Sequence, residues 1–189
     1  DKPMAPNHPR SHSILITGAT DGIGFLLAKA YAGRGHQVLA TGRRGIADDE
    51  AFFGMPNITY VTADQTDPEH ATQTILSTLS DLGWRDLDLV ILNGAMGWVG
   101  PPSEEATGKI GEQIAVNFTA PVLFAQALAP LLFSAKGRLV FVGSSAITKG
   151  RGAFATYCAT KAALDGLARS LAEEWRGRAG VTILHPGPT

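Results

Sequence analysis

The sequence predicts an α/β fold in which a doubly wound parallel sheet carries helices on both faces. Short aliphatic or β-branched runs, typical of buried strands, recur at residues 14–16, 38–41, 58–61, 87–92, 139–142 and 181–184. Segments with helical periodicity separate most of them, at residues 22–34, 68–82, within 108–133 and at 156–177. Strands and helices that alternate in this way connect by right-handed crossovers, so we expect all six strands to run parallel.

The composition describes one globular domain without an electrostatic footprint for nucleic acid. The 189 residues include 16 Lys and Arg against 17 Asp and Glu, a formal net charge of −1, and 44% are hydrophobic. Because the basic residues are scattered along the chain, we expect no nucleic-acid partner. Residues 14–189 are predicted to form the single domain, and the polar, proline-rich residues 1–13 to form a flexible extension.

The sequence carries no signal for a membrane or for an oxidising compartment. Its most apolar stretch, residues 115–133, is interrupted by polar residues and prolines, so we expect no membrane association. A single cysteine, Cys158, cannot form an internal disulfide. These two observations favour a cytoplasmic protein.

A glycine-rich turn directly follows the first predicted strand. It reads Thr17-Gly18-Ala19-Thr20-Asp21-Gly22-Ile23-Gly24 and opens onto a predicted helix. Glycines let the backbone turn tightly and approach a ligand, and a helix start offers N–H groups to a pyrophosphate. An ordinary glycine-rich connection is the alternative interpretation. The TGxxxGxG spacing resembles the turn of the short-chain dehydrogenase/reductase family, which implies a Rossmann-like fold.

Tyr157 and Lys161 stand four residues apart on a predicted helix and therefore share one face. Apolar residues continue that face: Leu164, Ala168, Leu171 and Trp175. Because such a stripe normally lies against the sheet, the pair is expected at the mouth of a cleft. A cation beside a phenol favours its ionised form, so the pair fits an acid/base tyrosine tuned by a lysine. A surface pair is the alternative, and the YxxxK spacing is again similar to the family.

The resemblance implies that Asn117 and Ser144 complete a catalytic set with Tyr157 and Lys161. Two serines, Ser144 and Ser145, follow the predicted strand at 139–142, where hydroxyls otherwise cap a turn. The thirteen-residue step to Tyr157 matches the family's catalytic serine at Ser144, with Ser145 as second choice. Asn117 is a polar residue in an otherwise apolar helix and needs a reason to be there. The family implies a water chain between the lysine and solvent; a satisfied internal amide is the alternative.

The resemblance also implies which residues contact a dinucleotide cofactor. Most of them directly follow predicted strands: Gly18, Thr20, Asp21, Gly22, Ile23, Gly24, Asp64, Gln65, Asn93, Gly94, Tyr157, Lys161, Pro186 and Gly187. Asp64 occupies the place where the family contacts the adenine ring. The order Asn93-Gly94-Ala95 exchanges the last two residues of the family's Asn-Ala-Gly, and His185 is interpreted as structural.

Two arginines indicate which dinucleotide is bound. An acidic residue at the end of the second strand of such folds binds the ribose 2′-hydroxyl, whereas arginine accommodates a 2′-phosphate. The chain has Arg43 and Arg44 at this place and no carboxylate. We therefore predict NADP(H), with NAD as second choice, although adjacent arginines on a loop are otherwise usually solvated.

The expected function is an oxidoreductase that interconverts a carbonyl group and a secondary alcohol, with Tyr157 moving the proton. A serine hydrolase is excluded because Ile147 stands where GxSxG needs its second glycine, and no HExxH metal motif occurs. The alternative is a catalytically silent dinucleotide-binding or regulatory protein. It is favoured by the expectation that the family's C-terminal segment, which follows Pro186-Gly187, is absent here.

Two further expectations concern the surroundings of the site. Trp98, Val99, Ile147 and Phe154 are predicted either to wall an apolar substrate pocket or to belong to the core. The family commonly pairs two long helices across two-fold axes, so the resemblance implies a homodimer or homotetramer. The helices at 156–177 and around Asn117 are the candidates for this contact.

Overall fold

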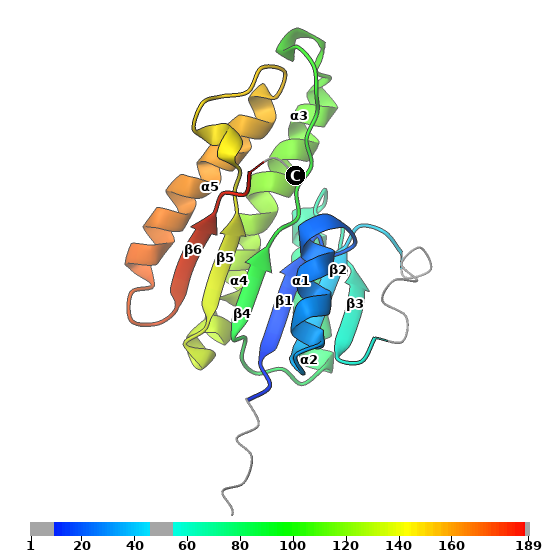
Figure 1. The fold of residues 1–189 in the computed structure, drawn as a ribbon, viewed down its shortest axis with the longest axis vertical. Coiled ribbons are helices and arrows are strands. Elements are labelled where there is room, and N and C mark those ends of the chain that lie inside the picture. Colours follow the sequence, from blue (N-terminus) through cyan, green and yellow to red (C-terminus); the bar gives the residue numbers. More distant parts are fainter. Residues whose placement is uncertain (1–9, 46–54, 188–189) are drawn as a thin grey trace, which may run out of the picture.

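The computed structural model describes residues 10–45 and 55–187, which form a six-stranded parallel sheet (Figure 1). The strands are β1 (Ser13–Thr17), β2 (Gln37–Gly42), β3 (Ile58–Thr62), β4 (Leu89–Leu92), β5 (Arg138–Val142) and β6 (Gly180–Leu184). They lie in the order β3-β2-β1-β4-β5-β6, and every neighbouring pair is parallel. This is the order of a doubly wound sheet, and it confirms the predicted fold class.

Helices cover the two faces of the sheet unequally within the described residues. The longer ones are α1 (Gly22–Ala32), α2 (Pro68–Asp81), α3 (Thr107–Ile114), α4 (Ala120–Ala135) and α5 (Ala155–Glu174). Helix α1 lies on one face, whereas α2, α4 and α5 lie on the other (Figure 1). Strand β1 shows the alternation that builds both layers: Leu15 packs under α2, α4 and α5, while Ile14 and Ile16 pack under α1.

A 29-residue helical segment, Thr107–Ala135, joins α3 to α4 through a π-helical stretch, η4 (Ala115–Thr119). Within the described chain it is the one segment long and apolar enough to cross a membrane, judged by length and composition alone. Phe124, Leu128 and Leu132 on its inner side are buried in the core shared with α2 and α5. The predicted absence of membrane association therefore stays a prediction.

The predicted elements are all present, with shifted ends. Strand β4 begins at Leu89 rather than at residue 87, because the Leu87 N–H donates to Leu131 O of α4 (3.1 Å) instead of to a neighbouring strand. The helix expected within 108–133 starts at Thr107 and extends to Ala135. Helix α5 ends at Glu174, three residues before the predicted end.

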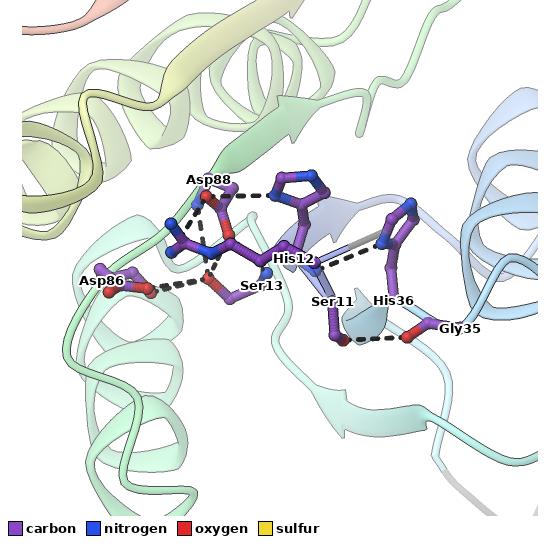
Figure 2. A network of polar contacts seen from close by, with 8 residues as sticks. Ser11, His12, Ser13, Gly35, His36, Asp86 and Asp88 are labelled. Atoms are coloured by element: carbon purple, nitrogen blue, oxygen red, sulfur yellow. Dashed lines mark hydrogen bonds and ion pairs between the residues drawn. The ribbon is translucent and has the colours of Figure 1, made fainter. Parts of the chain in front are cut away.

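Residues 10–13 belong to the folded domain, which corrects the predicted extent of the N-terminal extension. Figure 2 shows the polar network that holds them at the amino-terminal edge of the sheet. The Ser13 N–H donates to Asp88 Oδ2 (2.9 Å), the Ser11 hydroxyl donates to Gly35 O (2.9 Å), and the His12 N–H donates to His36 Nδ1 (3.2 Å). These contacts join residues 24 to 75 positions apart in the sequence, which composition alone does not reveal. Residues 1–9 lie outside the described part.

Candidate active site

The glycine turn after β1 is locked against the segment after β4. Gly18 adopts a φ of +61°, and a Cβ there would lie 2.5 Å from Gly94 Cα, so only glycine fits. The Asn93 side chain donates to Gly18 O (2.9 Å), and the Asn93 and Gly94 N–H groups donate to Thr17 Oγ1 (3.1 and 3.2 Å). Gly24 sits below the turn, where a Cβ would collide with Gly18 O. The turn is therefore pre-formed.

A cleft of about 650 Å³ opens over this turn at the carboxyl ends of β1, β2, β3 and β4. It is lined by eleven of the predicted cofactor residues: Gly18, Thr20, Asp21, Gly22, Ile23, Arg43, Arg44, Asp64, Gln65, Asn93 and Gly94. The predicted residues Gly24, Tyr157, Lys161, Pro186 and Gly187 are not part of its lining. The Asp21 carboxylate accepts from the Gly22 N–H (2.6 Å) and so caps α1 at the cleft.

Arg44 is fixed in place at the end of β2. Its carbonyl accepts from the Tyr60 hydroxyl (2.7 Å) and the Thr62 hydroxyl (3.1 Å), both on β3. Its guanidinium donates from Nη2 to Thr20 O (2.6 Å) in the glycine turn. Arg44 therefore bridges β2 and the turn, while Arg43 is exposed at the rim of the same cleft.

Asn117 lies in the π-helical stretch η4, fully buried, with its amide satisfied by protein groups. Nδ2 donates to Met96 O (2.7 Å) and to Thr160 Oγ1 (3.0 Å), and Oδ1 accepts from the Met96 N–H (2.8 Å). The buried Gln65 donates to Val116 O in the same stretch (3.2 Å). The satisfied internal amide is thus what the structure contains, and it ties the segment after β4 to α5. A water chain through Asn117 stays a prediction.

Tyr157 and Lys161 lie at the start of α5, and the face predicted from the sequence is buried against the sheet at Leu164, Ala168 and Trp175. The Lys161 ammonium is 5.9 Å from the centre of the Tyr157 ring and donates to Val142 O (2.8 Å), the last residue of β5. Lys161 is only 2% exposed, and this burial lowers its pKa to about 8. Among the described residues, the Tyr157 hydroxyl has no hydrogen-bond partner.

The Tyr157 ring rests on the backbone of Gly97, where a Cβ would lie 3.3 Å from ring atom Cδ2. Phe154 packs edge-on against the same ring at 6.2 Å between centroids. Of the other predicted wall residues, Val99 is 64% exposed and is therefore not a core residue. The phenol therefore lies between an aromatic side chain and the segment after β4.

Ser144 lies at the carboxyl end of β5 and does cap a turn. Its Oγ accepts from the Ala146 N–H (3.1 Å) at the start of η5 (Ser145–Ile147). Its own hydroxyl proton is donated to no acceptor within residues 10–45 and 55–187. The backbone N–H of Ser145 donates to Pro186 O (3.1 Å), which places Pro186 beside this turn. A capping role and a free hydroxyl proton are thus compatible in Ser144.

Comparison with known proteins now identifies the family. The family model described as short chain dehydrogenase matches residues 12–189. The chain belongs to the short-chain dehydrogenase/reductase family. It is 34% identical to the uncharacterized oxidoreductase YciK of Escherichia coli over 93% of this chain and 73% of that protein. It is 36% identical to 1-deoxy-11-beta-hydroxypentalenate dehydrogenase of Streptomyces exfoliatus over 95% of this chain and 68% of the relative.

Solved structures of the family share the fold. A metagenomic short-chain oxidoreductase in complex with NADP matches with a TM-score of 0.81 and 27% identity, over 94% of this chain and 83% of the other. Against other relatives the chain spans little more than half their length, as with the 51% it covers of 11-beta-hydroxysteroid dehydrogenase A from Sesamum indicum at 30% identity. These relatives are oxidoreductases by name.

The residues around the cleft fit the dinucleotide that the family binds. The pre-formed glycine turn faces the cleft with the N-terminus of α1, which suits a pyrophosphate, and the cleft volume is typical of ligand sites. Among the residues that the structure describes, no group of three or more His, Cys, Asp or Glu side chains is arranged to hold a metal ion.

Sequence reasoning missed a set of buried polar residues that support the site. Thr17 is fully buried and accepts the two N–H groups of Asn93 and Gly94. Gln113, also fully buried, donates to Glu105 Oε1 and accepts from the Trp98 N–H (3.2 Å), while Glu105 accepts from the Thr156 hydroxyl (2.6 Å) next to Tyr157. Thr17 opens the glycine motif, but the Glu105 contacts carry no sequence signal.

Proposed function

We propose that the protein is an NADP(H)-dependent oxidoreductase that interconverts a carbonyl group and a secondary alcohol by hydride transfer. The observation that carries the proposal is the pairing of the Tyr157 phenol with the buried Lys161 ammonium. Both lie at the carboxyl end of β5, at the same sheet edge as the glycine cleft. In open parallel sheets this edge is where ligands bind and where chemistry occurs.

The proposed role of Tyr157 is to give or take the proton of the substrate oxygen. Its hydroxyl is unbonded among the described residues and is therefore available to a substrate. With a pKa of about 8, the Lys161 ammonium is largely protonated at pH 7 and places a positive charge beside the Tyr157 ring. Ser144, whose hydroxyl proton is also uncommitted, would donate a hydrogen bond to the same substrate oxygen and hold the carbonyl group.

The proposed cofactor is held by the cleft residues. NADP(H) would supply or accept the hydride. The turn at Gly18 and the start of α1 would bind its pyrophosphate, and Asp64, at the end of β3, would lie beside the adenine ring. Pro186 and Gly187 follow β6 at the same edge and would contact the nicotinamide end. Asn117, through Met96 and Thr160, would keep the segment after β4 and α5 in register.

The preference for NADP(H) over NAD(H) rests on Arg43 and Arg44. Both line the cleft at the end of β2, where the described residues include no carboxylate that would compete for the ribose 2′-hydroxyl. A guanidinium pairs bidentately with a phosphate, so the 2′-phosphate is the group that these residues suit best. Solved neighbours that carry NADP support this assignment without deciding it for this chain.

The deciding experiment compares turnover and cofactor affinity in single variants of the full-length protein. Tyr157→Phe is expected to reduce NADPH oxidation, assayed against a panel of ketones and aldehydes, at least a hundredfold while NADPH affinity stays within about twofold. Lys161→Ala should damage both quantities, and Ser144→Ala should lower turnover more than Ser145→Ala. Tyr31→Phe, in α1 and away from the cleft, is the matched control.

Retention of most of the parent rate by Tyr157→Phe would remove the acid/base assignment. If every variant and the parent bind NADPH but none consumes it with any carbonyl compound, the catalytically silent dinucleotide-binding protein becomes the better description. Loss of NADPH binding in Tyr157→Phe would instead point to a misfolded site.

A further inference from the structure

Three consecutive backbone N–H groups after β5 are held by the last residue of β6 and the two residues that follow it. Gly143 donates to Leu184 O (2.7 Å) and Ser145 donates to Pro186 O (3.1 Å), which continues the parallel pairing of Val142 with Leu184. Between them, the Ser144 N–H donates to a side chain, His185 Nδ1 (3.2 Å). The backbone of Ser144 is therefore positioned by an imidazole rather than by a carbonyl group.

This contact assigns the tautomer of His185. Because the Ser144 N–H is a donor, Nδ1 must be the unprotonated acceptor, and the ring proton belongs on Nε2. Nε2 lies 3.5 Å from Asp165 Oδ1 on α5, and the other oxygen of Asp165 accepts from Arg169 Nε (2.8 Å). The carboxylate thus faces the protonated nitrogen, which stabilises the tautomer that the Ser144 contact needs.

The sequence also makes room for the imidazole. A Cβ on Gly143 would lie 2.5 Å from His185 Nδ1 and 2.7 Å from its Cε1, so any side chain at 143 would displace the ring. The His185 side chain is 28% exposed, and its hydrogen bond with the Ser144 N–H lies at the surface. The absence of a side chain at Gly143 therefore allows the His185 ring to reach the Ser144 N–H.

We infer that His185 is a positioning residue for Ser144: its Nδ1 fixes the Ser144 backbone, and Asp165 holds the ring in the accepting tautomer. The inference rests on the proposed function, in which the Ser144 hydroxyl binds the substrate oxygen. Since Ser144 Oγ already accepts from the Ala146 N–H, the His185 contact adds a second restraint on the same residue. Two restraints on one residue reduce the conformations from which its hydroxyl can donate.

Two substitutions test the roles of the two nitrogens of the His185 ring separately. In His185→Asn, the amide oxygen can accept near the position of Nδ1, but nothing reaches Asp165. In His185→Gln, the amide nitrogen can reach toward Asp165, but no acceptor stands at the Nδ1 position. His70→Gln, an exposed histidine on α2, is the matched control.

The first measurement does not depend on activity. Hydrogen exchange of the Ser144 amide, followed by NMR on the ¹⁵N-labelled full-length protein, should be at least tenfold faster in His185→Gln than in the parent. It should stay near the parent rate in His185→Asn. The ring nitrogens of His185 should report a protonated Nε2 and an unprotonated Nδ1 in the parent protein.

The second measurement is turnover, with the ketone and aldehyde panel as probe. His185→Gln should lower kcat roughly three- to tenfold, as expected for loss of one hydrogen bond, with NADPH affinity unchanged, and His185→Asn should restore kcat. Equal exchange of the Ser144 amide in both variants, or a protonated Nδ1, would overturn the inference. Altered exchange with unchanged kcat would also overturn it, provided that Ser144→Ala is impaired. If Ser144→Ala keeps its rate, the proposed function has failed at Ser144 instead.

Discussion

At the scale of single residues, Lys161 combines a functional charge with an unfavourable environment. Its ammonium is buried and has one acceptor among the described residues, Val142 O. The charged form is disfavoured by desolvation, which is why its pKa falls from 10.5 to about 8. The proposed role nevertheless requires the charged form beside Tyr157. Such a residue is expected to reduce stability in exchange for activity.

This conflict predicts a pH dependence of stability that belongs to Lys161. Its pKa is lower in the folded than in the unfolded state, so between about pH 8 and 10.5 the unfolded state binds more protons. The free energy of unfolding therefore gains from this residue as pH rises through that window, by up to about 3 kcal/mol. Urea unfolding of the parent and Lys161→Met at pH 7 and pH 10.5 measures the difference. A stability difference that is the same at both pH values contradicts the prediction.

Arg43 and Arg44 predict the cofactor preference. Arg43→Ala is expected to weaken NADPH binding roughly ten- to hundredfold and to leave NADH binding nearly unchanged, because a hydrogen bond to a charged phosphate is lost. Arg44→Ala should weaken both, since its guanidinium also supports Thr20 O in the turn. Fluorescence titration with both cofactors measures this, with the exposed Arg85→Ala as control. Equal affinities of the parent for NADPH and NADH would mean that both arginines are only solvated.

At the scale of elements, the sequence predicts the sheet well because each strand contains a short run of aliphatic or β-branched residues. The glycine turn was predictable because Gly18, Gly22 and Gly24 recur at a fixed spacing after the first strand. The π-helical stretch η4 was not predictable, because the contacts that hold it come from residues far away in the sequence. Gln65 and Met96, far away in sequence, bind its backbone and side chains. Asn117 was the one visible signal of this stretch, as a polar residue in an apolar helix.

The same limit applies to the contacts between elements. His185 was interpreted as structural because nothing in its neighbourhood in the sequence points to Ser144. Its two partners are Ser144, which follows β5, and Asp165 on α5, and only the fold brings them together. The resemblance to the family predicted the roles of single residues, whereas the contacts that position these residues became visible only in the fold.

The prediction at the scale of elements concerns the amide of Asn117. Asn117→Ala removes the partners of the N–H and C=O of the half-buried Met96, and it removes one of the two bonds of the buried Thr160 hydroxyl, which still donates to Tyr157 O. We expect a loss of about 2–4 kcal/mol in the free energy of unfolding together with lower turnover. Chemical denaturation measures the first quantity, and Lys109→Ala on the exposed side of α3 is the control. A loss no larger than that of the control variant would mean that the amide network contributes little.

At the scale of the whole molecule, the two ends of the parallel strands carry different groups of residues. The carboxyl-terminal edge holds the glycine cleft, Ser144, Tyr157 and Lys161. The amino-terminal edge holds the network of Figure 2, in which Asp88 accepts from Ser13 and lies 3.2 Å from His12 Nδ1. Burial of Asp88 raises its pKa, but the bonds from Ser13 and His12 outweigh this and lower it overall. Polar contacts therefore hold the start of the domain at one edge, and the glycine cleft opens at the other.

The last prediction concerns the apolar surface that the fold leaves uncovered. Only 33% of the most apolar window of Thr107–Ala135 is buried within the chain, and α5 exposes small residues at Ala159, Ala162, Ala163 and Gly166. Small residues at this helical spacing allow a second helix to approach closely, so we expect two copies to pair α4 and α5 across a two-fold axis. Light scattering at micromolar concentration should find a dimer or tetramer, and Ala163→Arg should shift it toward the monomer. A parent protein that is monomeric contradicts this, and binding of the monomer to lipid vesicles would assign the same surface to a membrane instead.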